Sequence, residues 1–269
     1  MKDIARNLLE NGKEIYDDAL KPAAQETGKT LALIPRTINA ALAPLRQWIE
    51  YREYNIAETK KLLEIKLKNV GAEHIVSPEP YIAVPAIQSI SYSMDSQELR
   101  DMYANLLARS MTDYDKDKVH PSFVEIIRQL TPDEAKLLKF FAVDKSFPLS
   151  DVRRVINDKG HFIEYIHNYT NIADRVCENP REVSAYIDNL SRLKIIEVTD
   201  KYLTDDNKYK PLEESELIRG LLDMKIDEGQ KWKIDRKSFD VTSYGREFID
   251  TCVIDKVCVV NMSTDNHGE

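Results

Sequence analysis

Hydrophobic positions recur at helical spacing over most of the first half of the chain. Residues 50–70 place apolar side chains at every third or fourth position among charged ones, which is typical of an amphipathic helix. Residues 99–111 repeat this pattern directly after a serine that is a good N-cap. Three prolines within 77–85 predict an extended connection, which a short helix follows. With a further short helix predicted over 121–129, this half should fold as a helical bundle.

The second half mixes helical and strand-like patterns. Helices are predicted over 132–141, behind the capping-box signature of Thr131 and Glu134, over 151–157 and over 183–193. Residues rich in β-branched side chains predict strands, and a last helix closes the chain. The predicted strands are 195–198, 231–235 and 238–241, and the last helix is 244–253 with Thr242 as its cap.

Three helices followed by strands and a closing helix are typical of a winged helix-turn-helix domain. In this interpretation, residues 161–178 are an insertion between the second and third helices, and residues 200–230 are an enlarged wing. The predicted fold class is therefore mainly α, with an N-terminal helical bundle and a C-terminal winged-helix-like α+β domain.

The length of 269 residues favours two domains. We expect a helical domain over 1–127, a winged-helix-like domain over 128–258 and a disordered tail over 259–269. The formal net charge is −8, and neither half has an excess of basic residues. Because proteins that coat nucleic acid carry a basic field, generic DNA coating is disfavoured.

Three cysteines without C-x-x-C spacing and a charged N-terminus predict a cytoplasmic protein. The sequence contains no run of about 18–20 apolar residues, so it predicts no membrane-spanning helix. The most unusual stretch is 27–49, which contains no acidic residue. We expect it to form a hairpin in the helical bundle, with peripheral contact to the inner membrane or to a partner as the alternative. The side chains that would make such contacts are Leu31, Ile34, Ile38, Leu42, Leu45 and Trp48.

In a winged-helix protein that binds DNA, the third helix, here predicted over 183–193, contacts the duplex. Its outward side chains carry balanced charge, whereas duplex binding depends on contacts between basic side chains and phosphates. The wing is locally basic. We therefore favour a protein partner over DNA at this surface. The candidate contact residues are Arg181, Ser184, Asn189, Arg192, Lys208, Lys210, Lys233, Arg236 and Lys237.

No motif in the sequence predicts a catalytic residue, a cofactor, a metal or a small-molecule substrate. His161 and His167 flank Glu164, but at a spacing of six they would lie on different faces of a helix, so we predict no metal site there. His120 and Pro121 form a motif of unknown role, which we interpret as the start of the next helix.

Four segments carry a resemblance to the abortive infection alpha family of bacterial phage-defence proteins. They are 19–30 (ALKPAAQETGKT), 42–45 (LAPL), 99–111 (LRDMYANLLARSM) and 119–138 (VHPSFVEIIRQLTPDEAKLL). The C-terminal part ends in a T-x-x-G-x-x-F pattern formed by Thr242, Gly245 and Phe248. The resemblance implies a role in defence against phage, through death or arrest of the infected cell. It implies no established reaction and therefore no catalytic residues.

From these observations the sequence predicts a non-enzymatic antiphage protein that acts through contacts with itself or with a phage or defence component. Two alternatives stay open. A winged-helix transcriptional regulator would bind a specific duplex with a steep salt dependence. A membrane-perturbing effector would use residues 27–49.

Overall fold

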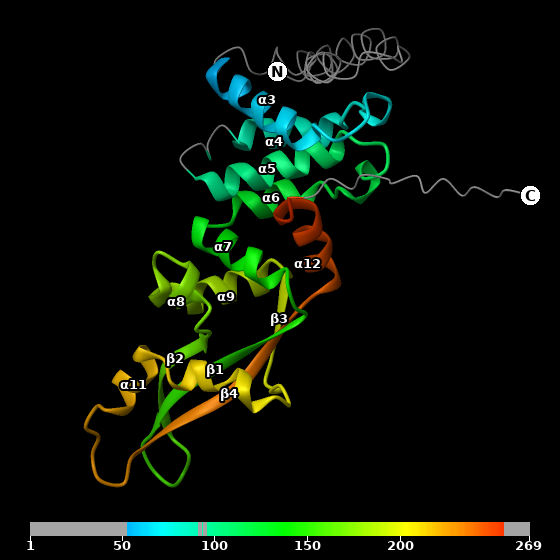
Figure 1. Ribbon diagram of the computed structural model, residues 1–269. Helices are drawn as coiled ribbons and strands as arrows, with labels where there is room; N and C mark the ends of the chain where they lie inside the picture. The colour runs from blue at the N-terminus through cyan, green and yellow to red at the C-terminus, as the bar shows by residue number, and fades with distance from the viewer. Residues whose placement is uncertain (1–52, 91–92, 94–95, 256–269) are drawn as a thin grey trace, which may run out of the picture. The chain divides into compact units, whose positions relative to one another are not determined.

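The computed structural model describes residues 53–90, 93 and 96–255 (Figure 1). The chain forms two compact units, Met1–Gln129 with Ile254–Glu269 and Leu130–Val253. The protein is mainly helical, and its second unit contains a four-stranded antiparallel sheet.

The first unit contains four described helices, three of which pack around α5. The four are α3 (Glu53–Leu67), α4 (Pro80–Ile90), α5 (Gln97–Ser110) and α6 (Ser122–Arg128), with 3-10 turns at Ala72–His74 and Lys116–Lys118. Every side chain from Met102 to Ser110 is buried, because α5 contacts the other three helices. Ser96 caps α5 by accepting a hydrogen bond from the backbone N–H of Leu99 at 3.3 Å.

The prediction of an extended connection over 77–85 is wrong for its second part. Helix α4 begins at Pro80 and continues through Pro85. Proline is tolerated at the first helical position, where its missing N–H has no partner to lose. An internal proline costs about 3 kcal/mol, but Ile82, Ile87 and Ile90 are buried on this helix, and their packing offsets that cost.

The second unit surrounds a sheet with short helices. The helices are α7 (Pro132–Phe141), α8 (Ala173–Val176), α9 (Val183–Arg192), α10 (Lys210–Glu213), α11 (Glu216–Leu222) and α12 (Ser243–Phe248). The strands are β1 (Ser146–Val155), β2 (Phe162–Tyr169), β3 (Ile196–Thr199) and β4 (Lys231–Val241). Two 3-10 turns, Pro180–Glu182 and Asp206–Lys208, and a π-helical turn, Ile249–Val253, complete the unit.

The strands lie in the order β2-β1-β4-β3, and all neighbours are antiparallel. The predicted helix over 151–157 is wrong, because these residues belong largely to β1. Strand β1 pairs with β4 continuously from Ser146↔Asp240 to Val155↔Lys231 and with β2 on its other side. Hydrogen bonding on both edges fixes the extended conformation, whatever the local propensity.

Three further predictions need correction. Residues 231–235 and 238–241 form one strand, β4, instead of two. The segment 161–178, expected as an insertion, supplies β2 and α8. The final helix is α-helical only to Phe248 and ends in the π-helical turn, although Thr242 caps it as predicted, accepting from the N–H of Gly245 at 2.8 Å.

The core of the second unit is aromatic. Phe141 of α7, Phe147 of β1 and Phe239 of β4 lie with ring centroids 4.8–5.2 Å apart, within the range favoured for aromatic pairs. The predicted capping box is present at the start of α7: Thr131 accepts from the N–H of Glu134, whose carboxylate accepts from the N–H of Thr131.

Candidate functional site

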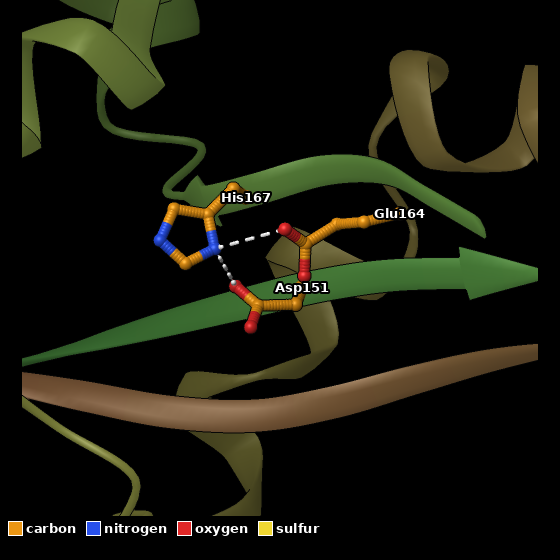
Figure 2. Close-up of side chains that lie close together, drawn as sticks. All are labelled: Asp151, Glu164 and His167. Carbon is orange, nitrogen blue, oxygen red and sulfur yellow. Dashed lines mark ion pairs between the residues drawn. The ribbon is translucent and has the colours of Figure 1, made fainter. Parts of the chain in front are cut away.

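One cluster of ionisable side chains joins β1 to β2 (Figure 2). The Nδ1 atom of His167 lies 3.4 Å from Oδ1 of Asp151 and 3.5 Å from Oε2 of Glu164. Asp151 is buried, whereas His167 and Glu164 are partly exposed. The ligand atoms of all three residues lie within 4.8 Å of one another, and this is the one such group of histidine and carboxylate side chains among the described residues.

Irregular pairing between β1 and β2 brings these residues together. Glu164 pairs with Arg153 and Ile166 with Val152, so Tyr165 has no partner of its own on β1. Side chains three residues apart normally lie on opposite faces of a strand. The extra residue is a β-bulge that reverses this alternation, so Glu164 and His167 both reach the face that carries Asp151.

One oxygen of each carboxylate in the cluster faces His167, and Lys237 donates to both oxygens of Asp151, at 3.4 Å to the Oδ1 that faces the histidine. Asp151 Oδ2 lies 3.2 Å from the buried Lys237 Nζ, while its Oδ1 accepts a 2.9 Å hydrogen bond from the backbone N–H of Asn168 and faces His167. Glu164 Oε1 lies 3.6 Å from Arg153 Nε, while its Oε2 faces His167. The geometry therefore directs two carboxylate oxygens toward one imidazole nitrogen.

The sequence-based argument against a metal at this position assumed helical geometry, and that assumption is wrong because the segment is a strand. The structure also separates the two histidines that the sequence suggested as a pair. His161 lies at the turn of the hairpin, where its Nδ1 is 3.1 Å from the side-chain nitrogen of Asn157. Sequence reasoning did not find Asp151 as the third member, because it lies on another strand.

A second feature is a set of side chains near the turn between β1 and β2, which we call the hairpin surface: the exposed Ile163, Tyr165 and Met224 and the half-buried Arg154 and Trp232. Cross-strand pairing places Ile163 and Trp232 on either side of Arg154. Tyr165 packs edge-on against Trp232 with 4.9 Å between centroids, and the Arg154 guanidinium lies 5.4 Å from the Tyr165 ring centre. The Trp232 indole nitrogen lies 3.5 Å from the carbonyl of Met224.

The predicted contact residues on α9 are largely engaged within the unit. Ser184 donates to the carbonyl of His167, and Asn189 donates to Glu134 Oε1 at 2.7 Å. The exposed side chains in and next to α9 carry both signs of charge, with the basic Arg181 and Arg192 and the acidic Glu182 and Asp188.

The predicted basic residues of the wing mostly face carboxylates. Lys237 is buried against Asp151. Ion pairs also join Lys208 to Asp144, Lys233 to Asp235, and Arg236 to both Glu213 and Asp206. Lys210 donates to the side chain of Asn207. The positive charge that the sequence suggested for this region is therefore largely compensated locally.

The apolar contact residues predicted in 27–49, namely Leu31, Ile34, Ile38, Leu42, Leu45 and Trp48, lie outside the described residues, as does the tail 259–269. Within the part of the chain that the structure describes, no helix combines the length and apolar character needed to cross a membrane.

The remaining sequence candidates have local structural roles. Pro121 directly precedes α6, and His120 Nδ1 accepts a 3.2 Å hydrogen bond from the backbone N–H of Ser122. The aspartates near His120 are engaged elsewhere, Asp113 with His74 and Asp115 with Arg109 and Lys118. Burial, with the nearby Asp133 carboxylate, raises the pKa of the Cys177 thiol to about 12, so this thiol is a poor nucleophile at neutral pH.

The sequence matches the family described as Abortive infection alpha over residues 51–252, about three quarters of its length. The chain belongs to this family, which associates it with abortive-infection-type antiviral defence. The resemblance predicted from the sequence is thereby confirmed.

Among solved structures, a protein described as uncharacterized, from the hydrocarbon-degrading marine bacterium Alcanivorax borkumensis SK2, is 18% identical, covering 48% of this chain and 90% of its own at a TM-score of 0.34. No curated protein matches the sequence.

Proposed function

We propose that the protein is a non-enzymatic component of abortive-infection-type phage defence, and that it acts by binding another protein through the hairpin surface. Family membership supports the defence role. The observation that carries the protein-binding mechanism is the composition of the hairpin surface. Tryptophan, tyrosine, methionine and arginine are the residue types enriched at protein–protein interfaces, and tryptophan, tyrosine and arginine dominate their binding energy.

The exposure of these side chains supports a role outside the fold. Met224 is 53% exposed, Ile163 41% and Tyr165 40%, although each has enough apolar area to contribute to a core. Grouped exposed apolar side chains mark interaction sites in soluble proteins. Arg154 and the neighbouring Lys231 have no carboxylate partner among the described residues. The matching partner is therefore a protein surface that presents apolar side chains together with carboxylates.

Compensated charge favours this partner over duplex DNA. The affinity of a protein for DNA depends on uncompensated cations that displace counterions from phosphates. In this chain the wing cations Lys208, Lys233 and Arg236 pair with carboxylates, and the exposed side chains around α9 balance in sign. Arg154, beside an aromatic pair, gives local recognition of a carboxylate without the broad basic surface that a duplex needs.

Phage plating tests the proposal. Cells that carry the gene should plate phage less efficiently than cells without it, with loss of the infected cells. Replacing Tyr165 and Trp232 by alanine should remove this protection while the melting temperature and circular dichroism spectrum remain near those of the wild type. Tyr202→Ala is the matched control, because Tyr202 is a 66% exposed aromatic residue outside the hairpin surface, and it should keep full protection. Full protection by the double variant would contradict the proposal.

Strand connectivity favours one second candidate, a winged-helix DNA reader. We infer a winged-helix-like arrangement for Leu130–Val253. The elements α7, β1, α8, α9, β3 and β4 occur in this order in the chain, with β2 inserted after β1 and with α10 and α11 inserted after β3, and β4 lies between β1 and β3 in the sheet. In that candidate α9 would enter the major groove. Fluorescence anisotropy with labelled duplexes at low and high salt tests it. Binding that Arg181→Glu with Arg192→Glu abolishes would support the DNA reader, whereas the protein-binding proposal expects no such binding.

A further inference from the structure

The Asp151, Glu164 and His167 cluster has the spacing of ligands around a metal ion. The two N–O separations of 3.4 and 3.5 Å exceed the 2.7–3.2 Å that is usual for an N–H···O hydrogen bond. Ligand atoms that bind one cation at about 2.1 Å lie about 3.0–3.4 Å from their neighbours, for octahedral to tetrahedral geometry. The two N–O separations are therefore closer to those between ligands on one cation than to those of a direct hydrogen bond, and all three ligand atoms lie within 4.8 Å of one another.

The imidazole nitrogen at the centre of the cluster is a second, independent indication. His167 Nδ1 is buried, and it makes no hydrogen bond within the described part of the chain. A buried polar atom without a partner is costly. The two oxygens that face this nitrogen come from Asp151 on β1 and Glu164 on β2 (Figure 2). A cation between the three atoms would satisfy the nitrogen lone pair and both oxygens together.

We propose that Asp151 Oδ1, Glu164 Oε2 and His167 Nδ1 bind one divalent transition-metal cation, with Zn²⁺ as the reference case. Three protein ligands leave at least one coordination position for water or for a group from a partner. The partial exposure of Glu164 and His167 gives the cation access from solvent. The bound ion would join β1 to β2.

The neighbouring cations decide which metal the site takes. Lys237 contacts both oxygens of Asp151, and Arg153 contacts the Glu164 oxygen that faces away from His167, so these cations orient the ligands and compensate much of their negative charge. Ca²⁺ and Mg²⁺ bind mainly through oxygen ligands that carry net negative charge. In a site with compensated charge, affinity depends on the bond between the metal and imidazole, which favours Zn²⁺, Ni²⁺ or Co²⁺.

The test uses the full-length protein, freed of metal with a chelator, and titrates Zn²⁺ by calorimetry at pH 7.5. The variants are Glu164→Gln and His167→Gln. Both side chains are partly exposed, and neither change removes Asp151, the carboxylate partner of the buried Lys237. His161→Gln is the matched control, since this histidine lies in the same hairpin but outside the cluster. We expect one Zn²⁺ per chain for the wild type and the control, and at least tenfold weaker binding for each ligand variant.

Two further readouts make the test independent of stoichiometry. Co²⁺ bound to the wild type should give visible d–d absorption bands that are lost in His167→Gln, and Zn²⁺ should raise the melting temperature of the wild type but not of that variant. Millimolar Mg²⁺ should neither raise the melting temperature nor compete with Zn²⁺. Equal Zn²⁺ affinity of the wild type and His167→Gln, or no binding to either, would overturn the proposal.

Discussion

Gly245 lies directly against the backbone carbonyl of Ile195. A Cβ atom built on Gly245 would be 1.9 Å from that oxygen, far inside van der Waals contact. The close approach belongs to one arrangement of hydrogen bonds: the N–H of Thr242 donates to Ile195 O at 3.0 Å, and the Thr242 hydroxyl donates to the carbonyl of Lys194 at 2.7 Å. The T-x-x-G spacing thus joins the start of α12 to the segment that precedes β3.

Replacing Gly245 by alanine should therefore destabilise the protein by at least about 3 kcal/mol, because a rigid backbone atom blocks the new methyl group. Urea denaturation followed by circular dichroism measures the change. Gly220→Ala is the control. Gly220 lies within α11, and its added Cβ would meet no atom within 4 Å, so the variant should be neutral or gain up to about 1 kcal/mol. Equal stability of the two variants would contradict the packing argument.

Asp133 should make the stability of the protein depend on acidic pH. Burial opposes ionisation of this carboxylate, but the backbone N–H groups of Glu178 and Asn179 and the Lys136 ammonium stabilise the charged form, so its pKa lies below the usual value. Because the pKa of Asp133 is lower in the native state than in the unfolded state, its ionised form stabilises the fold at pH values above the unfolded pKa of about 4. This stabilisation is lost as the pH decreases through the native pKa.

The matching experiment compares the wild type with Asp133→Asn between pH 2 and pH 8. At pH 7 the variant should be less stable by about 1–3 kcal/mol, because it loses the charge that its donors and Lys136 stabilise. The difference should stay constant down to about pH 5 and narrow below about pH 4. A difference independent of pH over the whole range would show that the charge of Asp133 does not matter.

The buried pair of Asp151 and Lys237 should be sensitive to loss of one partner. Lys237→Met leaves the Asp151 charge buried beside an apolar side chain, which should cost about 3–5 kcal/mol. The double variant Asp151→Leu with Lys237→Met removes both charges and should recover a large part of this loss. Guanidinium denaturation of the wild type, the single variants Asp151→Leu and Lys237→Met, and the double variant measures the coupling. Additive effects of the two changes would mean that the pair does not act as a unit.

The Cys177 thiol should react slowly in the native protein. Its pKa rises from about 9 to about 12, with burial as the largest cause and the nearby Asp133 carboxylate as the next. At pH 8 the thiolate fraction should fall roughly a thousandfold, and alkylation by iodoacetamide should slow in proportion. Peptide mapping by mass spectrometry measures the rate at Cys177, and denaturant should restore it. Rapid labelling of the native protein at this residue would contradict its buried environment.

Helix caps and amphipathic helices were predicted correctly, because the interactions that produce them join residues only a few positions apart. The capping box of Thr131 and Glu134 is present because its hydrogen bonds span three residues, and Ser96 and Thr242 cap their helices for the same reason. The helical repeat in residues 50–70 likewise predicted α3, since an apolar face with a period of 3.6 residues has few other ways to be buried.

Residues 151–157 show where local reasoning fails. Ser150, a good N-cap directly before this segment, suggested a helix, but pairing with β2 and β4 supplies hydrogen bonds that only the assembled sheet provides. The cluster of Asp151, Glu164 and His167 likewise depends on the pairing of the strands. A bulge at Tyr165 turns Glu164 and His167 to one face, and a separate strand brings Asp151 beside them.

The sequence by itself determined the helical character of the chain, its helix caps and its membership in the abortive infection alpha family. Only the tertiary structure decided which charges neutralise one another, which aromatic residues remain exposed and which three side chains share a centre. The physical reason is range. Capping and amphipathic periodicity act within a few residues. Strand register and buried ion pairs depend on residues far apart in the chain, 94 positions for Ser146 and Asp240 and 86 for Asp151 and Lys237.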